Sequence, residues 1–194
     1  TQAALAHTNV DVMALNDGIR AGLKRIGALE VGHGGVYQTR AGAREFLSGD
    51  RITLLRNARL HSADGRGLLE VRNGQLGNVV RTDHDALTVK IDDGGMVQVP
   101  LRDYPDVDHG YALTIHKTQG ATLDRVYALE SAGMDRNLLY VAMSRHRQDC
   151  LLIADKASHK DVDGLIRSLA RRHKVKEMTL DYEGPGLAPA ERAW

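Results

Sequence analysis

The stretch from Tyr111 to Val126, "YALTIHKTQGATLDRV", decides the fold of this chain. Its first five residues form an apolar run that is typical of a buried strand, "HKTQG" predicts a turn, and the apolar run after it predicts a second strand. The polar residues of the turn would lie at the carboxyl edge of a sheet, where open α/β sheets bind their ligands. Gly120 would let a phosphate approach the backbone closely. The stretch therefore predicts a ligand-facing edge, although it lacks the G-x-x-x-x-G-K-[ST] pattern of a phosphate loop.

The sequence before this stretch also alternates strand and helix. "AALAHT" (3–8) predicts a short buried strand that ends at a Thr8–Asn9 helix cap. Apolar residues then recur every three or four positions, which predicts an amphipathic helix that Gly27 ends. These residues are Val12, Leu15, Ile19, Leu23 and Ile26. Residues 30–48 are Gly-rich with little pattern, and "RITLLRN" (51–57) predicts another strand.

Between Gly74 and Leu101 the pattern changes to short strands alone. "GNVVRTD", "ALTVKID" and "MVQVPL" predict three of them, and "DDGG" (Asp92 to Gly95) predicts a hairpin between the last two. The α/β pattern returns after this region. We therefore expect an inserted, β-barrel-like module inside an α/β domain.

The C-terminal part predicts two helices and a strand. "DRNLLYVAMSRHR" has the apolar spacing of a helix with Asp135 as its cap, and "CLLIAD" predicts a buried strand that contains the single cysteine, Cys150. Residues 158–172 predict a basic helix, whereas residues 173–194 have no period and predict an extended tail.

Composition narrows the class of protein. The chain has 194 residues, 42% hydrophobic and 26% charged, with a net charge of +1, so it can form a packed core and is not a strongly basic nucleic-acid coat. It contains no membrane-length apolar run and no signal-peptide pattern, which predicts a cytoplasmic setting and no membrane partner. Because the sequence opens on "TQAALAHTN" without an initiator Met, we expect a piece of a longer protein.

Two segments carry groups that suit phosphate chemistry. One is the turn around Thr114, His116 and Lys117, and the other is the helix end that presents Ser144, Arg145 and Arg147. Taken alone, the first is better explained as an ordinary polar turn, and the second as positive charge at a helix C-terminus.

Together the two segments resemble motifs V and VI of superfamily 1 DNA helicases, in the variant of the RecD-like branch. The region "LAHTNVDVMALNDGIR" resembles motif IV of that branch, and "GDRITLLRN" with "VRNGQLGNVV" resembles the lead into its SH3-like insertion. The resemblance is strongest to the helicase part of TraA-type conjugative relaxases. It implies an α/β, RecA-like (P-loop NTPase-type) parallel-sheet domain that carries a small SH3-like β-barrel.

The resemblance also implies site residues. Arg145 of "YVAMSR" would be the arginine finger that touches the γ-phosphate of ATP, and Gln119 and Gly120 would face the nucleotide. Thr114 and His116, with the adjacent Lys117, would meet the backbone of single-stranded DNA. Thr122 stands where many relatives have a ribose-binding Glu.

Half of such an active site is missing from the sequence. There is no Walker A motif, so the ligands of Mg²⁺ would lie outside this chain, and no metal site is expected within it. The sequence also lacks a His cluster with a Tyr nucleophile of the relaxase type. We therefore expect the chain to be inactive alone, and its longer parent to be an ATP-dependent 5′→3′ DNA helicase.

These implications give an expected organisation and set of partners. Residues 1–74 and 107–172 would form the second RecA-like domain, 75–106 the insertion and 173–194 the tail. The partners would be single-stranded DNA, the N-terminal RecA-like half and a relaxase domain, in a bacterial cytoplasm. The alternatives are a vestigial, non-hydrolysing module that binds single-stranded DNA, and a piece of a RecD-type repair helicase.

Overall fold

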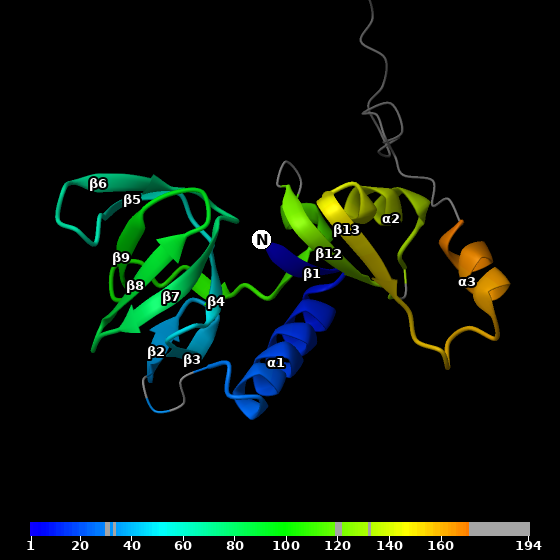
Figure 1. Ribbon diagram of the computed structural model, residues 1–194, viewed down its shortest axis with the longest axis horizontal. Coiled ribbons are helices and arrows are strands. Elements are labelled where there is room, and N and C mark those ends of the chain that lie inside the picture. Colours follow the sequence, from blue (N-terminus) through cyan, green and yellow to red (C-terminus); the bar gives the residue numbers. More distant parts are fainter. Residues whose placement is uncertain (30–31, 33, 119–121, 132, 171–194) are drawn as a thin grey trace, which may run out of the picture.

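The computed structural model describes residues 1–29, 32, 34–118, 122–131 and 133–170. Strands near the N-terminus and in the C-terminal part of the described chain form one parallel sheet, and strands in the middle of the chain form an antiparallel sheet (Figure 1). We call the described residues of 1–29 and 110–170 the parallel-sheet unit, and those of 34–109 the all-β unit. None of the helices in the described ranges is long and apolar enough to cross a membrane.

The parallel-sheet unit has four strands in the order β11-β1-β12-β13, and every neighbouring pair is parallel. Their bounds are Ala112–Thr114 for β11, Gln2–Ala6 for β1, Leu123–Leu129 for β12 and His146–Ile153 for β13. Strands distant in sequence thus lie side by side, and all four carboxyl ends meet at one edge. The prediction of an α/β fold with a parallel sheet is confirmed.

Three α-helices accompany this sheet: α1 (Asn9–Arg25), α2 (Arg136–Met143) and α3 (Val162–Leu169). Thr8 caps α1 by accepting a hydrogen bond from the Asp11 N–H at 3.1 Å, and Asp135 caps α2 by accepting one from the Leu138 N–H at 2.8 Å. Both caps agree with the sequence prediction. The turn after β11 is a short 3₁₀ helix, η1 (Ile115–Thr118).

Helices α1 and α2 lie on opposite faces of the sheet (Figure 1). Leu138, Leu139 and Val141 of α2 pack on the core formed by alternate strand residues such as Leu5 and Val126. On the other face, α1 differs from the prediction, because its two buried residues are Asn16 and Arg20. Polar contacts described below explain this burial.

The all-β unit contains a five-stranded antiparallel sheet in the order β10-β4-β7-β8-β9. The strands are β10 (Val107–His109), β4 (Arg51–Leu54), β7 (Leu76–Thr82), β8 (Ala86–Ile91) and β9 (Met96–Pro100). Two hairpins join it, β2 (Gly34–Thr39) with β3 (Gly42–Leu47), and β5 (Ala58–His61) with β6 (Leu68–Val71). The predicted hairpin at Asp92 to Gly95 connects β8 to β9.

The all-β unit is larger than the insertion expected at 75–106. It extends from β2 to β10, because Tyr37 and Phe46 of the first hairpin share one hydrophobic core with Ile52, Val89 and Val107. The Gly-rich composition of residues 30–48 concealed that hairpin, since neither strand shows a clean alternation of apolar and polar residues.

Candidate functional site

The carboxyl edge of the parallel sheet gathers polar side chains from two neighbouring strands. His7 follows β1, and His116 and Lys117 follow β11, with both of the latter exposed. The rings of His7 and His116 have centroids 6.1 Å apart. Residues from two segments far apart in sequence thus form one polar surface, as the parallel topology requires.

Thr114 has a structural role at this edge. It is buried, with 8% exposure, and its hydroxyl accepts a 3.4 Å contact from the Lys117 N–H at the start of η1. Thr118 closes the same turn by donating its hydroxyl proton to the Ile115 carbonyl at 2.8 Å. The two threonines fix the backbone that carries His116 and Lys117.

Arg145 lies at the opposite, amino edge of the sheet. Because α2 runs back between β12 and β13, it ends where those strands begin, and the Leu123 N–H donates to the Arg145 carbonyl at 2.9 Å. The Arg145 side chain is half-buried, and its Nε donates to the Val141 carbonyl at 3.1 Å. Among the described residues no carboxylate pairs with it, so its terminal nitrogens can meet an anion.

The predicted site residues therefore fall into two groups. Thr114, His116 and Lys117 lie at one edge of the sheet and Arg145 at the other, roughly 20 Å away along a seven-residue strand. Gln119 and Gly120 lie outside the described residues. Thr122, just before β12, is exposed. No cluster of three or more metal-ligating side chains occurs within the described ranges.

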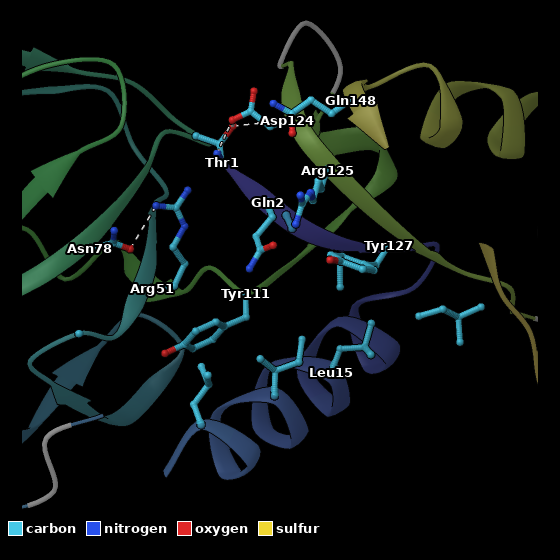
Figure 2. Close-up of a pocket in the computed structure, with 16 residues that line it drawn as sticks. Thr1, Gln2, Leu15, Arg51, Asn78, Tyr111, Asp124, Arg125, Tyr127 and Gln148 are labelled. Atoms are coloured by element: carbon cyan, nitrogen blue, oxygen red, sulfur yellow. Dashed lines mark hydrogen bonds and ion pairs between the residues drawn. The ribbon is translucent and has the colours of Figure 1, made fainter. Parts of the chain in front are cut away.

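A pocket of about 820 Å³ opens beside α1, and none of the described residues in the two groups lines it (Figure 2). Leu15, Ile19 and Leu23 of α1 line it, so much of the predicted apolar face of α1 is turned to this pocket. Its other walls come from the amino ends of β1 and β12, from β13, and from the all-β unit, where Arg51 and Asn78 contribute.

Sequence reasoning missed a buried polar cluster next to this pocket, which we call the Asp50 cluster: Arg20, Glu45, Asp50 and Tyr111. Asp50 is fully buried in the β3–β4 turn. It accepts hydrogen bonds from Arg20 Nε and Nη2, each at 2.9 Å, and from the Tyr111 hydroxyl at 2.7 Å. Glu45 accepts from Arg20 Nη1 at 2.9 Å. The sequence signal was two polar residues, Asn16 and Arg20, four positions apart on an otherwise amphipathic helix.

Burial shifts the pKa values of groups around the cluster. The pKa of Tyr111 is raised, chiefly by burial and then by its hydrogen bond to Asp50. The pKa of His109 is lowered below 6.5, chiefly because burial disfavours the imidazolium. His109 Nε2 lies 3.1 Å from the Glu45 carbonyl oxygen, which can only accept, so the neutral ring carries its proton on Nε2.

We expect His109 to make the fold less stable in acid. A His whose folded pKa is below its unfolded value binds more protons when unfolded, so stability falls as pH drops below about 6.5. His109→Gln keeps an N–H for the Glu45 carbonyl but does not titrate, and should lose less stability between neutral pH and about pH 5. Urea unfolding at both pH values measures this. The exposed control His84→Gln should behave like the unsubstituted chain; an equal loss in His109→Gln would contradict the assignment.

Comparison with known proteins identifies the family. Residues 109–153, which hold both groups of predicted site residues, match the UvrD-like helicase C-terminal domain. The conjugal transfer protein TraA of Rhizobium radiobacter is 42% identical over 182 residues, which are 92% of this chain. The chain belongs to the RecD-like, TraA-type helicases. The ATP-dependent RecD2 DNA helicase of Deinococcus radiodurans is 34% identical over 56% of the chain. The chain spans only 16% of the length of the TraA relative and 15% of RecD2.

Solved structures agree on the fold. A Pif1 helicase of Bacteroides, bound to single-stranded DNA, matches with a TM-score of 0.56 at 20% identity, over 78% of this chain and 40% of that one. Pif1 of Candida albicans matches with a TM-score of 0.55 at 16% identity, over 88% and 47%. The parallel-sheet unit therefore shares the α/β fold of these helicases, and residues 109–153 match a helicase C-terminal domain.

Proposed function

We propose that the chain is the second motor domain of an ATP-dependent 5′→3′ DNA helicase within a conjugative relaxase, and that Arg145 is its arginine finger. The observation that carries the proposal is the position of Arg145. It lies half-buried at the amino edge of the sheet, held by one hydrogen bond to Val141, with no described carboxylate to neutralise it. A guanidinium held in this way suits the charge that develops on a transferred phosphoryl group.

ATP and Mg²⁺ fit only half of a site on this chain. Arg145 would contact the γ-phosphate, and Gln119 and Gly120 would face the nucleotide from the connection to β12. ATP supplies the free energy of phosphoryl transfer, and the phosphate cradle and the ligands of Mg²⁺ would come from an N-terminal RecA-like half. In this arrangement Arg145 would direct its positive charge toward the γ-phosphate.

Single-stranded DNA would lie across the carboxyl edge. His116 and Lys117 are exposed there, on a turn that Thr114 holds in place. A motor has to move over any sequence, so contacts to the DNA backbone suit it better than contacts to base edges. We assign His116 and Lys117 to direct DNA contact and Thr114 to the shape of the turn.

The all-β unit would be the SH3-like subdomain of the helicase, which helps to hold the strand. Its boundaries would be residues 34–109, with 1–33 and 110–170 forming the two parts of the RecA-like domain. Its strand content and its position between the two parts support this proposal. The chain would work together with a relaxase domain, an N-terminal RecA-like half and DNA, in a bacterial cytoplasm. The TraA relatives support the first two partners, because they are conjugal transfer proteins much longer than this chain.

The DNA assignment can be tested with this chain. Lys117→Ala should weaken binding to a fluorescent single-stranded oligonucleotide, and should reduce the slope of log K against log salt by about 0.7, because one phosphate contact is lost. His116→Ala should weaken binding at every salt concentration. Fluorescence anisotropy measures both.

Matched controls lie on the all-β unit, away from the carboxyl edge. Lys90→Ala and His61→Ala remove an exposed side chain of the same type from the unit that would only help to hold the strand, and should change the affinity and the salt slope less than Lys117→Ala and His116→Ala do. If Lys117→Ala and His116→Ala bind as tightly as these controls, the carboxyl edge is not the DNA site.

A further inference from the structure

The Asp50 cluster joins the two units of the chain. Asp50 belongs to the all-β unit, where its backbone N–H donates to the Leu47 carbonyl at 3.1 Å and its carboxylate accepts from the Leu47 N–H at 2.7 Å. Arg20 and Tyr111, which donate to the same carboxylate, belong to the parallel-sheet unit. One fully buried carboxylate thus receives hydrogen bonds from both units.

Helix α1 contacts both the all-β unit and strand β11 through the same face. Arg20 holds Asp50, and Asn16, one turn earlier, pairs with the backbone of Ala112. The Asn16 amide donates to the Ala112 carbonyl at 3.3 Å and accepts from the Ala112 N–H at 2.9 Å. Residues four apart lie on one side of a helix, so a shift of Asp50 relative to α1 is also a shift relative to β11.

The segment that connects the all-β unit to β11 is closely packed at Gly110. Gly110 donates its N–H to the Arg51 carbonyl at 2.9 Å, and a Cβ at Gly110 would lie 2.5 Å from the backbone of Ile52. Tyr111 follows at once, with its hydroxyl on Asp50, and β11 begins at the next residue. Only three strand residues then separate this segment from η1, which carries His116 and Lys117.

A second contact links the all-β unit to η1 directly. Leu76 of β7 is buried in the hydrophobic core of the parallel-sheet unit, together with Leu113 and Ile115. Gly74, at the start of this contact, has a φ of +84°, and a Cβ there would lie 3.6 Å from the Lys117 carbonyl oxygen. The all-β unit therefore touches both ends of the β11–η1 segment.

We propose that Arg20, Asp50 and Tyr111 are positioning residues that make the all-β unit and the β11–η1 segment move as one rigid body. This rests on the proposed function in one respect, namely that η1 carries the DNA contacts. A bidentate Arg–carboxylate pair has a single favourable geometry, whereas an apolar contact could slide. Breaking the pair leaves a buried charge without a partner, so the joint resists opening. When either part binds DNA and moves, the other part would then move with it.

The rigidity can be measured without DNA. Spin labels at Lys90→Cys in the all-β unit and Asn137→Cys on α2, with Cys150→Ser to remove the single native cysteine, report the distance between the units by pulsed electron paramagnetic resonance. The chain with an intact cluster should give one narrow distribution of distances. Asp50→Asn should lose that single narrow peak, because Arg20 loses its fully buried counter-charge and keeps only the more exposed Glu45.

Two further variants make the result decisive. Asp92→Asn removes the partner of the neighbouring Arg51, but that ion pair lies wholly within the all-β unit, so its distribution should stay narrow. Arg20→Met combined with Asp50→Asn removes both charges of the pair, while the amide oxygen can still accept from the Leu47 N–H and the amide nitrogen can donate to the Tyr111 hydroxyl oxygen. This variant should fold and still broaden the distribution. If the folded double variant keeps one narrow peak at the original distance, the proposal is overturned.

A motor assay separates this proposal from the DNA assignment. In a longer protein with both RecA-like halves, Tyr111→Phe should reduce the base pairs unwound per ATP hydrolysed while the ATPase rate stays near that of the unsubstituted protein. If Tyr111 contributed only to stability, Tyr111→Phe would lower the unwinding rate and the ATPase rate by the same factor. Failure of His116→Ala to weaken DNA binding would sink the DNA assignment but would leave the distance measurement standing.

Discussion

Arg145→Ala is expected to lower the rate of DNA-stimulated ATP hydrolysis by about 10³ to 10⁵-fold in a longer protein that joins this chain to a P-loop half, and to leave DNA binding almost unchanged. The reason is geometric. Arg145 lies at the amino edge of the sheet, whereas His116 and Lys117 lie at the carboxyl edge, so the substitution removes a charge from the amino edge alone, where we propose that the nucleotide binds. Steady-state ATPase assays with and without a single-stranded oligonucleotide measure the effect.

Arg147 provides a matched control for this experiment. It lies two residues later at the same edge, but its side chain is 66% exposed and is 3.8 Å from Asp124. Arg147→Ala removes the same charge from a position without the helix-end hydrogen bond of Arg145, and should retain most of the ATPase activity. Equal turnover in Arg145→Ala and the unsubstituted protein would exclude the finger assignment.

The same assay separates a motor from the alternative of a non-hydrolysing module. If the longer protein binds single-stranded DNA but shows no hydrolysis, and Arg145→Ala changes nothing, the module has lost its motor function. The chain by itself should hydrolyse no ATP, because it has no phosphate loop. Hydrolysis by the purified chain that is lost on Arg145→Ala would contradict the proposed division of the active site.

The sequence predicted the parallel-sheet unit better than the all-β unit. "AALAHT" and "YALTI" are apolar runs with clear ends, and Thr8 and Asp135 are local cap signals whose hydrogen bonds span three residues. By contrast, the hairpin of β2 and β3 depends on Tyr37 and Phe46 reaching a core that strands far along the chain complete. Local pattern carries no information about such a partner.

The candidate site was predictable only in part, because contiguous motifs can be recognised in the sequence and contacts between distant residues cannot. The motifs around His116 and Arg145 are contiguous, so their resemblance to a family could be seen in the sequence. Asp50 and Arg20 are 30 residues apart, and neither is unusual until the fold brings them together. A lone Arg on an amphipathic helix is ordinarily solvated, so the sequence predicts that the apolar residues form the buried face, whereas Leu15, Ile19 and Leu23 line a pocket.

This buried pair leads to the largest stability effect that we expect. Asp50→Ala should reduce the free energy of unfolding by about 3 to 5 kcal/mol, because it leaves the Arg20 guanidinium in the interior with only Glu45 as a partner and deprives Leu47 N–H and Tyr111 O–H of their acceptor. Urea unfolding followed by circular dichroism measures the change.

The control is Asp92→Ala, which breaks the ion pair to Arg51 nearer the surface and should cost about 1 kcal/mol or less. The contrast tests where the fold places its charge, since both carboxylates face an arginine but only that of Asp50 is fully enclosed. Equal losses for the two variants would mean that Asp50 is hydrated in solution. In that case α1 would be held on the all-β unit only by packing and by the more exposed ion pairs of Arg20 and Lys24 with Glu45, and a rigid joint between the two units would lose its physical basis.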